Sequence, residues 1–148
     1  MKKIYIGSDH AGYELKSVLI KYLDDLGYEV KDEGAYKLDK EDDYPDFIKQ
    51  VAEAVAVDKT SLGIVLGGSG EGEQISANKI EGIRAAEYYG GNLDIVKLAR
   101  LHNDANILSL GARFIKNDEA IDAVKLFIET PFSEEDRHIR RINKIEKE

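Results

Sequence analysis

Short apolar runs alternate with amphipathic stretches along the whole chain. Each apolar run predicts a strand, and the run LGIVL, apolar throughout, is typical of a strand buried on both faces. The predicted strands cover residues 3–7, 28–30, 62–66, 83–86 and 106–110.

Apolar residues three and four positions apart predict helices between these strands and after the last one. Gly27 can close the first helix, and Pro45 suits the first turn of the second. Asn117 or Asp118 could cap the helix that Pro131 ends. Residues 133–136 have the spacing of a capping box and predict a final helix over about 133–147.

The alternation of strands and helices, without a repeat or a linker, favours a single domain over residues 1–148. It predicts one parallel sheet covered by helices on both faces. Ligands of such sheets bind beyond the carboxyl ends of the strands. The candidate segments there are 8–10, 67–73, 87–89 and 111–113. His102 and Asn103 precede the last strand, so they reach this edge only if the turn bends back or if they belong to a partner subunit.

Composition narrows the function classes. The chain has 148 residues, 34% of them charged, and a net charge of -8, which argues against nucleic acid as a partner. The absence of cysteine excludes disulfides, thiolate nucleophiles and cysteine-ligated metals. With no apolar run long enough for a bilayer and no signal-peptide pattern, we expect a cytoplasmic protein that acts on a small molecule and not on a membrane.

The segment GGSGEGE at 67–73 is the richest in candidate chemistry. Its glycines allow backbone N–H groups to approach a ligand, and a loop between a strand and a helix is an anion site. It is not a phosphate-binding P-loop, because Glu73 stands where that motif needs lysine, and it lacks the third glycine of the dinucleotide motif. The loop therefore suits a small charge that develops during a reaction, or it is only a tight turn with solvated glutamates.

A carboxylate beside backbone donors indicates proton abstraction next to a carbonyl, with the donors stabilising the enediolate oxygens. Glu73 is the better base candidate, since it lies nearer the helix start. A helix N-terminus lowers the pKa of a carboxyl, so we expect partial burial of Glu73 to offset this. Ser69 could carry a proton between neighbouring oxygens, or it could cap the helix.

The histidines and the basic tail leave alternatives open. Asp9 and His10 could divide tasks between a sugar ring and an anion, or Asp9 caps the first helix and His10 lies at the surface. His102 could be only a partner of the helix dipole. The three histidines lack the spacing of a metal motif, so no metal is expected.

In the tail, Arg137 and Arg141 share one helix face and could grip a phosphate, and Arg113 near the ligand edge supports this interpretation. The alternative is a solvated basic face, which runs on to Lys147. An isoleucine stripe on the other side suits docking on the body or on a second subunit: Ile139, Ile142 and Ile145.

Together the motifs resemble type B ribose-5-phosphate isomerase, a family that includes allose- and galactose-phosphate isomerases. The resemblance covers nearly the whole chain, with the motifs in order: 7–12 (GSDHAG), 43–45 (DYP), 67–73 (GGSGEGE), 77–79 (ANK), 102–103 (HN), 111–113 (GAR) and 137–141 (RHIRR). It implies a Rossmann-like three-layer α/β/α sandwich with a five-stranded parallel sheet. It also implies a homodimer, sometimes a tetramer, whose sites are built from both subunits, with the C-terminal helix packed on the partner.

The resemblance also implies the residue roles. Glu73 would move the proton between C1 and C2, Ser69 would assist exchange between the oxygens, and Asp9 and His102 would open the furanose ring. The amides of Gly68, Gly70 and Gly72 would hold the enediolate. Tyr44 and Asn103 would contact the sugar; the phosphate would be held by His10, Arg113, Arg137 and Arg141, with His138 beside them. No metal or organic cofactor is implied.

One departure concerns the base. Many members of the family have a cysteine where this chain has Gly67, but a cysteine-free branch uses the glutamate of Gly-Glu-Gln, which residues 72–74 match. The less familiar Glu71 and Tyr88-Tyr89 leave the sugar open between a five-carbon phosphate, a six-carbon phosphate and a free sugar. A phosphate- or nucleotide-binding module is the non-enzyme alternative.

Overall fold

The computed structural model describes residues 1–146 as one α/β unit. Its strands are β1 (Lys3–Ser8), β2 (Glu29–Asp32), β3 (Leu62–Gly67), β4 (Ala85–Tyr88) and β5 (Ile107–Gly111). Its helices are α1 (Tyr13–Asp25), α2 (Pro45–Val57), α3 (Glu71–Asn78), α4 (Asp94–Asn103), α5 (Asn117–Glu129) and α6 (Asp136–Glu146). Lys147, which the basic tail includes, lies outside the described residues.

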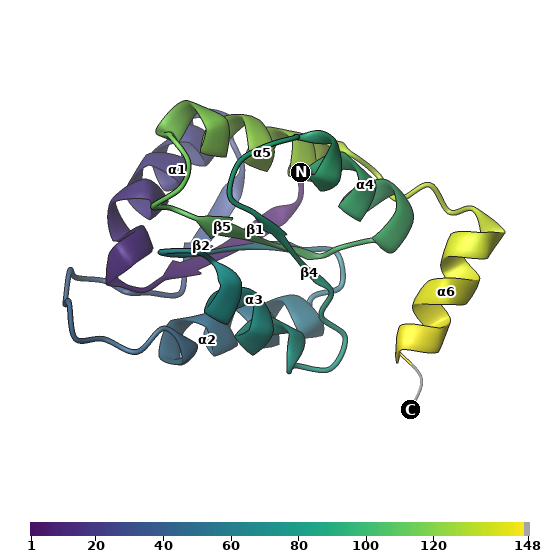
Figure 1. The fold of residues 1–148 in the computed structure, drawn as a ribbon, viewed down its shortest axis with the longest axis horizontal. Coiled ribbons are helices and arrows are strands. Elements are labelled where there is room, and N and C mark those ends of the chain that lie inside the picture. Colours follow the sequence, from purple (N-terminus) through teal and green to yellow (C-terminus); the bar gives the residue numbers. More distant parts are fainter. Residues whose placement is uncertain (147–148) are drawn as a thin grey trace.

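The five strands form one parallel sheet in the order β2-β1-β3-β5-β4. Figure 1 shows α1, α4 and α5 over one face of the sheet and α2 and α3 over the other. The predicted three-layer sandwich is therefore confirmed. Strand β3 lies at the centre of the sheet with every residue buried, as its apolar sequence predicts. The glycine loop that follows it therefore lies at the middle of the sheet's carboxyl edge.

Side chains of β3 alternate between the two cores. Ile64 and Leu66 face α1 and α5, whereas Val65 packs against Ile48 and Val51 of α2. This arrangement fixes the end of β3 between two filled layers, so the loop after it starts from a rigid point.

Element ends match the predictions in part. Gly27 has φ +89° just past α1, so it closes that helix as predicted. The N-cap of α5 is Lys116, so the prediction of Asn117 or Asp118 as the cap is wrong; Glu119 accepts the free N–H of Lys116 at 3.3 Å.

Two boundaries are corrected further. Helix α6 begins at Asp136 and not at Ser133, because Glu134 has a left-handed φ of 59° and Ser133 Oγ instead accepts the Glu135 N–H. Strand β4 begins at Ala85, where the chain first runs beside Ile107 of β5. Glu87 and Tyr88 therefore lie inside the strand and not after it, and only Tyr89 follows.

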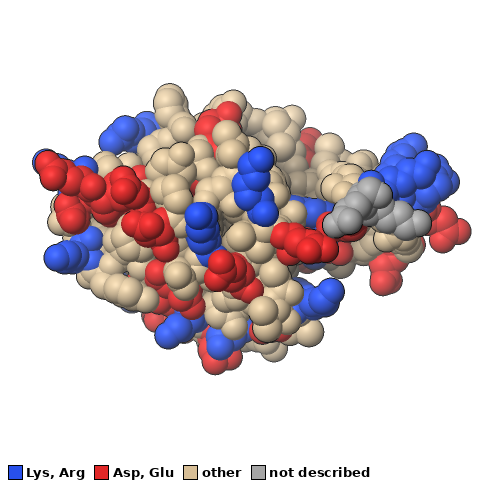
Figure 2. All heavy atoms as spheres, turned by 90° about the horizontal axis from the view of Figure 1, so that it is seen from below, with Lys and Arg blue, Asp and Glu red and all other residues tan. Residues whose placement is uncertain are grey.

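Helix α6 stands apart from the body beyond α4 (Figure 1). Figure 2 shows Lys and Arg side chains gathered at this end of the molecule. Among residues 1–146, the helices are all too short or too polar to cross a membrane.

Candidate active site

Hydrogen bonds from residues in and just after β5 hold the glycine loop at the edge of the sheet. The carbonyl oxygens of Gly67 and Gly68 accept the N–H groups of Ala112 and Arg113 at 2.8 and 3.0 Å. Ser109 Oγ donates to the Gly70 carbonyl at 2.7 Å, and Gly70 itself has φ +82°, a conformation that favours glycine. The loop is thus held in one conformation before any ligand arrives.

Glu73 lies in the first turn of α3, and its side chain folds back over Gly67. The residue is 4% exposed. A Cβ placed on Gly67 would lie only 2.1–2.3 Å from the carboxylate atoms of Glu73. The carboxylate therefore occupies the space that any side chain at position 67 would need.

Burial raises the pKa of Glu73; its own backbone N–H lowers this pKa, and the negative charge of Asp9 raises it. The net direction is upward. The expectation that burial offsets the helix N-terminus is therefore confirmed, and Glu73 is suited to taking up a proton from carbon.

Asp9 is the neighbour of Glu73 at the end of β1. Its carboxylate accepts the N–H groups of Ala11 and Gly12 at 3.0 and 3.4 Å, which caps the short 3-10 turn leading into α1. The capping role considered from the sequence is confirmed. Asp9 is 7% exposed and its negative charge acts on Glu73, so capping also fixes its carboxylate beside the base candidate.

Three further side chains border the loop. The ring of Tyr44 lies 2.6–2.9 Å from a Cβ built on Gly72, and the guanidinium of Arg113 lies 3.0 Å from one built on Gly68. Ser69 Oγ accepts the Glu71 N–H at 3.2 Å, so it does serve the helix start, and its hydroxyl proton stays free to donate elsewhere.

His10 lies at the same edge and is bound by Asp42, a residue that the sequence analysis missed. Nδ1 of His10 lies 2.7 Å from Asp42 Oδ1, and the His10 side chain is 26% exposed, so it is not a simple surface residue. Donor atoms of Asp9, His10 and Asp42 come within 4.8 Å of one another, the spacing of a metal site. Hydrogen bonds already join His10 to Asp42 and Ala11 to Asp9, so the cluster is better described as a hydrogen-bonded one.

Glu87 belongs to a segment that the sequence placed at the ligand edge, but the sequence assigned it no role. Its carboxylate lies 2.5 Å from a Cβ built on Gly70, under the loop. Burial, together with the neighbouring Glu71 and Glu73, raises the pKa of Glu87 to about 9. The available signal was a charge in the middle of a short apolar edge strand.

The remaining site candidates lie elsewhere in the chain. Helix α4 runs back across the sheet, so His102 and Asn103 lie at the amino edge, away from the glycine loop. The ring of His102 stacks on that of His138, with centroids 4.3 Å apart and an interplanar angle of 17°. Arg137 and Arg141 are exposed on α6. The structure of one chain thus brings together two groups, one around Glu73 and one around His138.

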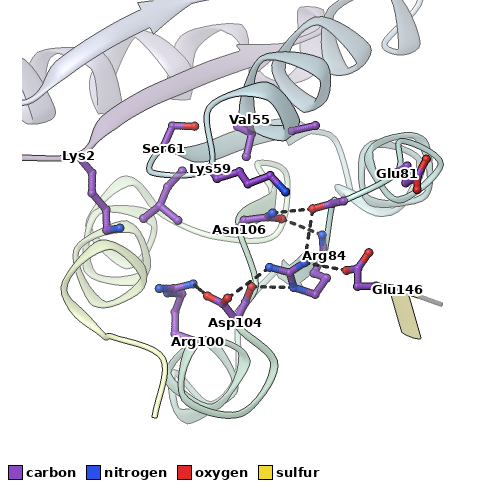
Figure 3. Close-up of a pocket in the computed structure, with 13 residues that line it drawn as sticks. Lys2, Val55, Lys59, Ser61, Glu81, Arg84, Arg100, Asp104, Asn106 and Glu146 are labelled. Atoms are coloured by element: carbon purple, nitrogen blue, oxygen red, sulfur yellow. Dashed lines mark hydrogen bonds and ion pairs between the residues drawn. The ribbon is translucent and has the colours of Figure 1, made fainter. Parts of the chain in front are cut away.

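A cavity of about 560 Å³ opens at the amino edge (Figure 3). Figure 3 shows Arg84 bonded to Glu146 and to Asp104, which also binds Arg100. In this cavity Arg84 and Arg100 are paired with Asp104 and Glu146, and the cavity lies at the edge that ligands of parallel sheets do not use. It therefore belongs to the scaffold that joins α4 and α6.

Comparisons with known proteins agree with this geometry. Residues 4–145 match the model of the Ribose/Galactose Isomerase family. Ribose-5-phosphate isomerase B of Mycolicibacterium paratuberculosis is 45% identical over 95% of this chain and 87% of its own length.

Solved structures agree as well. Ribose-5-phosphate isomerase B of Clostridium thermocellum has a TM-score of 0.91 at 45% identity, covering 97% of this chain and 95% of that one. The Mycoplasma genitalium enzyme with bound ribulose-5-phosphate has a TM-score of 0.92 at 39% identity, covering 97% and 93%. The resemblance seen in the sequence is confirmed: this chain belongs to the Ribose/Galactose Isomerase family.

Proposed function

We propose that this protein is an aldose–ketose isomerase that interconverts ribose 5-phosphate and ribulose 5-phosphate, with Glu73 as the base. The observation that carries the proposal is the buried Glu73 carboxylate over Gly67, beside a loop of backbone donors. The printed names of the similar proteins, and the ribulose-5-phosphate bound in one of them, support this substrate.

The proton transfer follows from the arrangement. Glu73 takes the proton from C2 of the open-chain aldose, and the electron pair of that bond forms the C1–C2 double bond while O1 becomes negative. N–H groups of the loop at Gly68, Gly70 and Gly72 stabilise this oxygen. Ser69 moves the hydroxyl proton from O2 to O1, and Glu73 returns its proton to C1, which gives the ketose.

Asp9 and His102 open the sugar ring in this proposal, and Tyr44 and Asn103 contact the sugar. Arg113 lies over one end of the loop and, with His10, forms the half of a phosphate site that a single chain provides. A second copy completes the phosphate site with Arg137, His138 and Arg141. It also contributes His102 and Asn103 to the sugar site.

A second copy has a surface to occupy. Strand β4 is an edge strand, and an apolar cavity of about 770 Å³ beside it is lined by Ile95, Leu98 and Ile145. A homodimer with a twofold axis covers this face in both copies and sends each α6 toward the other copy's glycine loop. Pairs of such dimers would give a tetramer. Figure 2 supports the pairing, since acidic side chains gather at the end opposite to the basic α6.

A six-carbon sugar phosphate is the second candidate, since the matched family includes galactose isomerases. The acids Glu71 and Glu87 lie beside the loop and bear on the choice of sugar. The carboxylate of Glu71 also speaks against the nucleotide-binding alternative, because a carboxylate repels a polyphosphate.

An isomerisation panel tests the function. Purified protein is assayed with ribose 5-phosphate, allose 6-phosphate, galactose 6-phosphate and the free sugars, with and without a chelator. We expect the highest kcat/KM with ribose 5-phosphate and no effect of the chelator. A higher kcat/KM with a six-carbon phosphate would favour the second candidate, and no turnover of any sugar would refute both.

A further inference from the structure

One carboxylate from a distant loop holds both the backbone and the ring of His10. Asp42 Oδ1 lies 2.7 Å from His10 Nδ1 and accepts the His10 backbone N–H at 3.2 Å. The two residues are 32 positions apart in the chain. The Asp42 side chain is 8% exposed, so this contact is largely shielded from water.

The loop that carries Asp42 is itself fixed to the end of β1. Ser8 donates its N–H to the Gly34 carbonyl, and Ala35 donates its N–H to the Ser8 carbonyl, each at 2.7 Å. The buried Lys16 donates to Asp32 at 2.9 Å and to the Ala35 carbonyl. The start of the loop is therefore bound at the residue two positions before His10.

The far end of the loop is fixed as well. Asp42 donates its N–H to the Asp39 carbonyl at 3.1 Å, and Tyr44, two residues further on, packs over Gly72. The position of Asp42 is thus set on both sides, and its carboxylate is a fixed acceptor for His10.

This contact decides which nitrogen of His10 is available. A carboxylate only accepts hydrogen bonds, so the proton shared with Asp42 sits on Nδ1. Nε2 is then the nitrogen left for a ligand, and it donates to a phosphate oxygen when it carries a proton as well, as in the imidazolium form of the ring.

We propose that Asp42 is a positioning residue, which holds the His10 ring through Nδ1 and so presents Nε2 to the phosphate of the substrate. The inference rests on the proposed function. Asp9, the other acid within 4.8 Å, does not compete for the ring, because it is bonded to Ala11 and Gly12.

The burial of Asp42 agrees with such a role. Its second oxygen, Oδ2, is buried and makes no hydrogen bond with any residue of 1–146. A buried acceptor without a partner costs folding free energy. Stability alone therefore does not account for an acid at this position, whereas the orientation of His10 does.

The first test reads the wild-type protein by nitrogen NMR of ¹⁵N-histidine. We expect His10 to carry its proton on Nδ1, with a coupling to the Asp42 carboxylate, and to revert to the mixed tautomers of a free histidine in Asp42→Ala. A wild-type His10 without a proton on Nδ1 would overturn the proposal, and this measurement needs no variant to fold.

The second test is kinetic, with ribose 5-phosphate as the probe. Asp42→Ala should raise KM about tenfold or more, with a smaller change in kcat, because an oriented charge-assisted contact is lost. Asp42→Asn keeps an oxygen that accepts from Nδ1 and should recover most of the KM. Glu41→Gln, an exposed acid of the same loop, is the matched control and should not change KM.

The outcomes separate this inference from the proposed function. If Asp42→Asn loses as much as Asp42→Ala, the hydrogen bond does not position the ring and the inference is wrong. If the wild-type protein does not turn over ribose 5-phosphate, the proposed function fails, and the nitrogen spectra still decide whether Asp42 sets the tautomer.

Discussion

The carboxylate of Glu73 lies in the volume that a side chain on Gly67 would occupy, 2.1–2.3 Å from where its Cβ would be. The two positions therefore constrain each other: an acid at 73 that folds back over β3 requires a glycine at 67. The family resemblance implies a cysteine base at position 67 in many members. In this chain the carboxylate of Glu73, the proposed base, occupies that space.

Glu73→Gln tests the base directly. The amide keeps the shape of the side chain but takes up no proton, so kcat should fall by about 10²–10⁴ while the fold is retained. The matched control is Glu81→Gln, an exposed glutamate beyond the end of α3, which should leave kcat intact. A Glu73→Gln variant with near-normal turnover would exclude this residue as the base.

Gly67→Ala should disable the enzyme without unfolding it. The added methyl group meets the flexible end of Glu73 rather than backbone, so the carboxylate can swing away at little cost in stability. We expect a loss in kcat of about 10²-fold or more and a small change in Tm. The double variant Gly67→Ala/Glu73→Gln should be no slower than Glu73→Gln alone; additive losses would show that the methyl group acts on something else.

Glu87 gives a pH signature in stability. Its folded pKa of about 9 is above its ordinary value of 4.5, so between these values the folded protein holds a proton that the unfolded chain has released. The free energy of unfolding therefore falls as pH rises through that window, because the folded protein must keep or lose this proton at increasing cost. Glu87→Gln removes the titration, and its Tm advantage over the wild type should widen from about pH 5 to about pH 9. The exposed Glu81→Gln is the control, and a Tm difference that stays constant with pH would contradict the raised pKa.

Mixed subunits test the shared site. Glu73→Gln lacks the base, and Arg137→Ala/Arg141→Ala lacks the phosphate ligands on α6, which should raise KM sharply. In a dimer with exchanged α6 helices, one site of each heterodimer carries both defects and the other carries none. Random mixing should restore about a quarter of the wild-type sites. Arg140→Ala, exposed on the same helix, is the matched control; no recovery of activity, or a monomer by light scattering, would place each site within a single chain.

The sequence predicted the sheet and its helices because the spacing of apolar residues and the length of apolar runs are set by residues close together in the chain. It also predicted the group around Glu73, since the carboxyl ends of parallel strands lie at one edge of the sheet. It did not predict Asp42 as the partner of His10 or Glu87 as the acid under Gly70. Each contact joins segments far apart in the chain, and no local pattern marks it. The start of α6 was misplaced for the opposite reason, since the backbone at Glu134 adopted a conformation that its residue type does not favour.

Helix α6 leaves the body after α5 and touches its own chain mainly through the His138 ring, Ile142 and the Glu146–Arg84 ion pair. Little of its surface is thus protected within one copy. Hydrogen exchange of its amides should then slow as the protein is concentrated, whereas the amides of β3 exchange at one rate throughout. Helix α6 would then be stably ordered only when a second copy binds it. Dilution would therefore abolish catalysis before it unfolds the sheet.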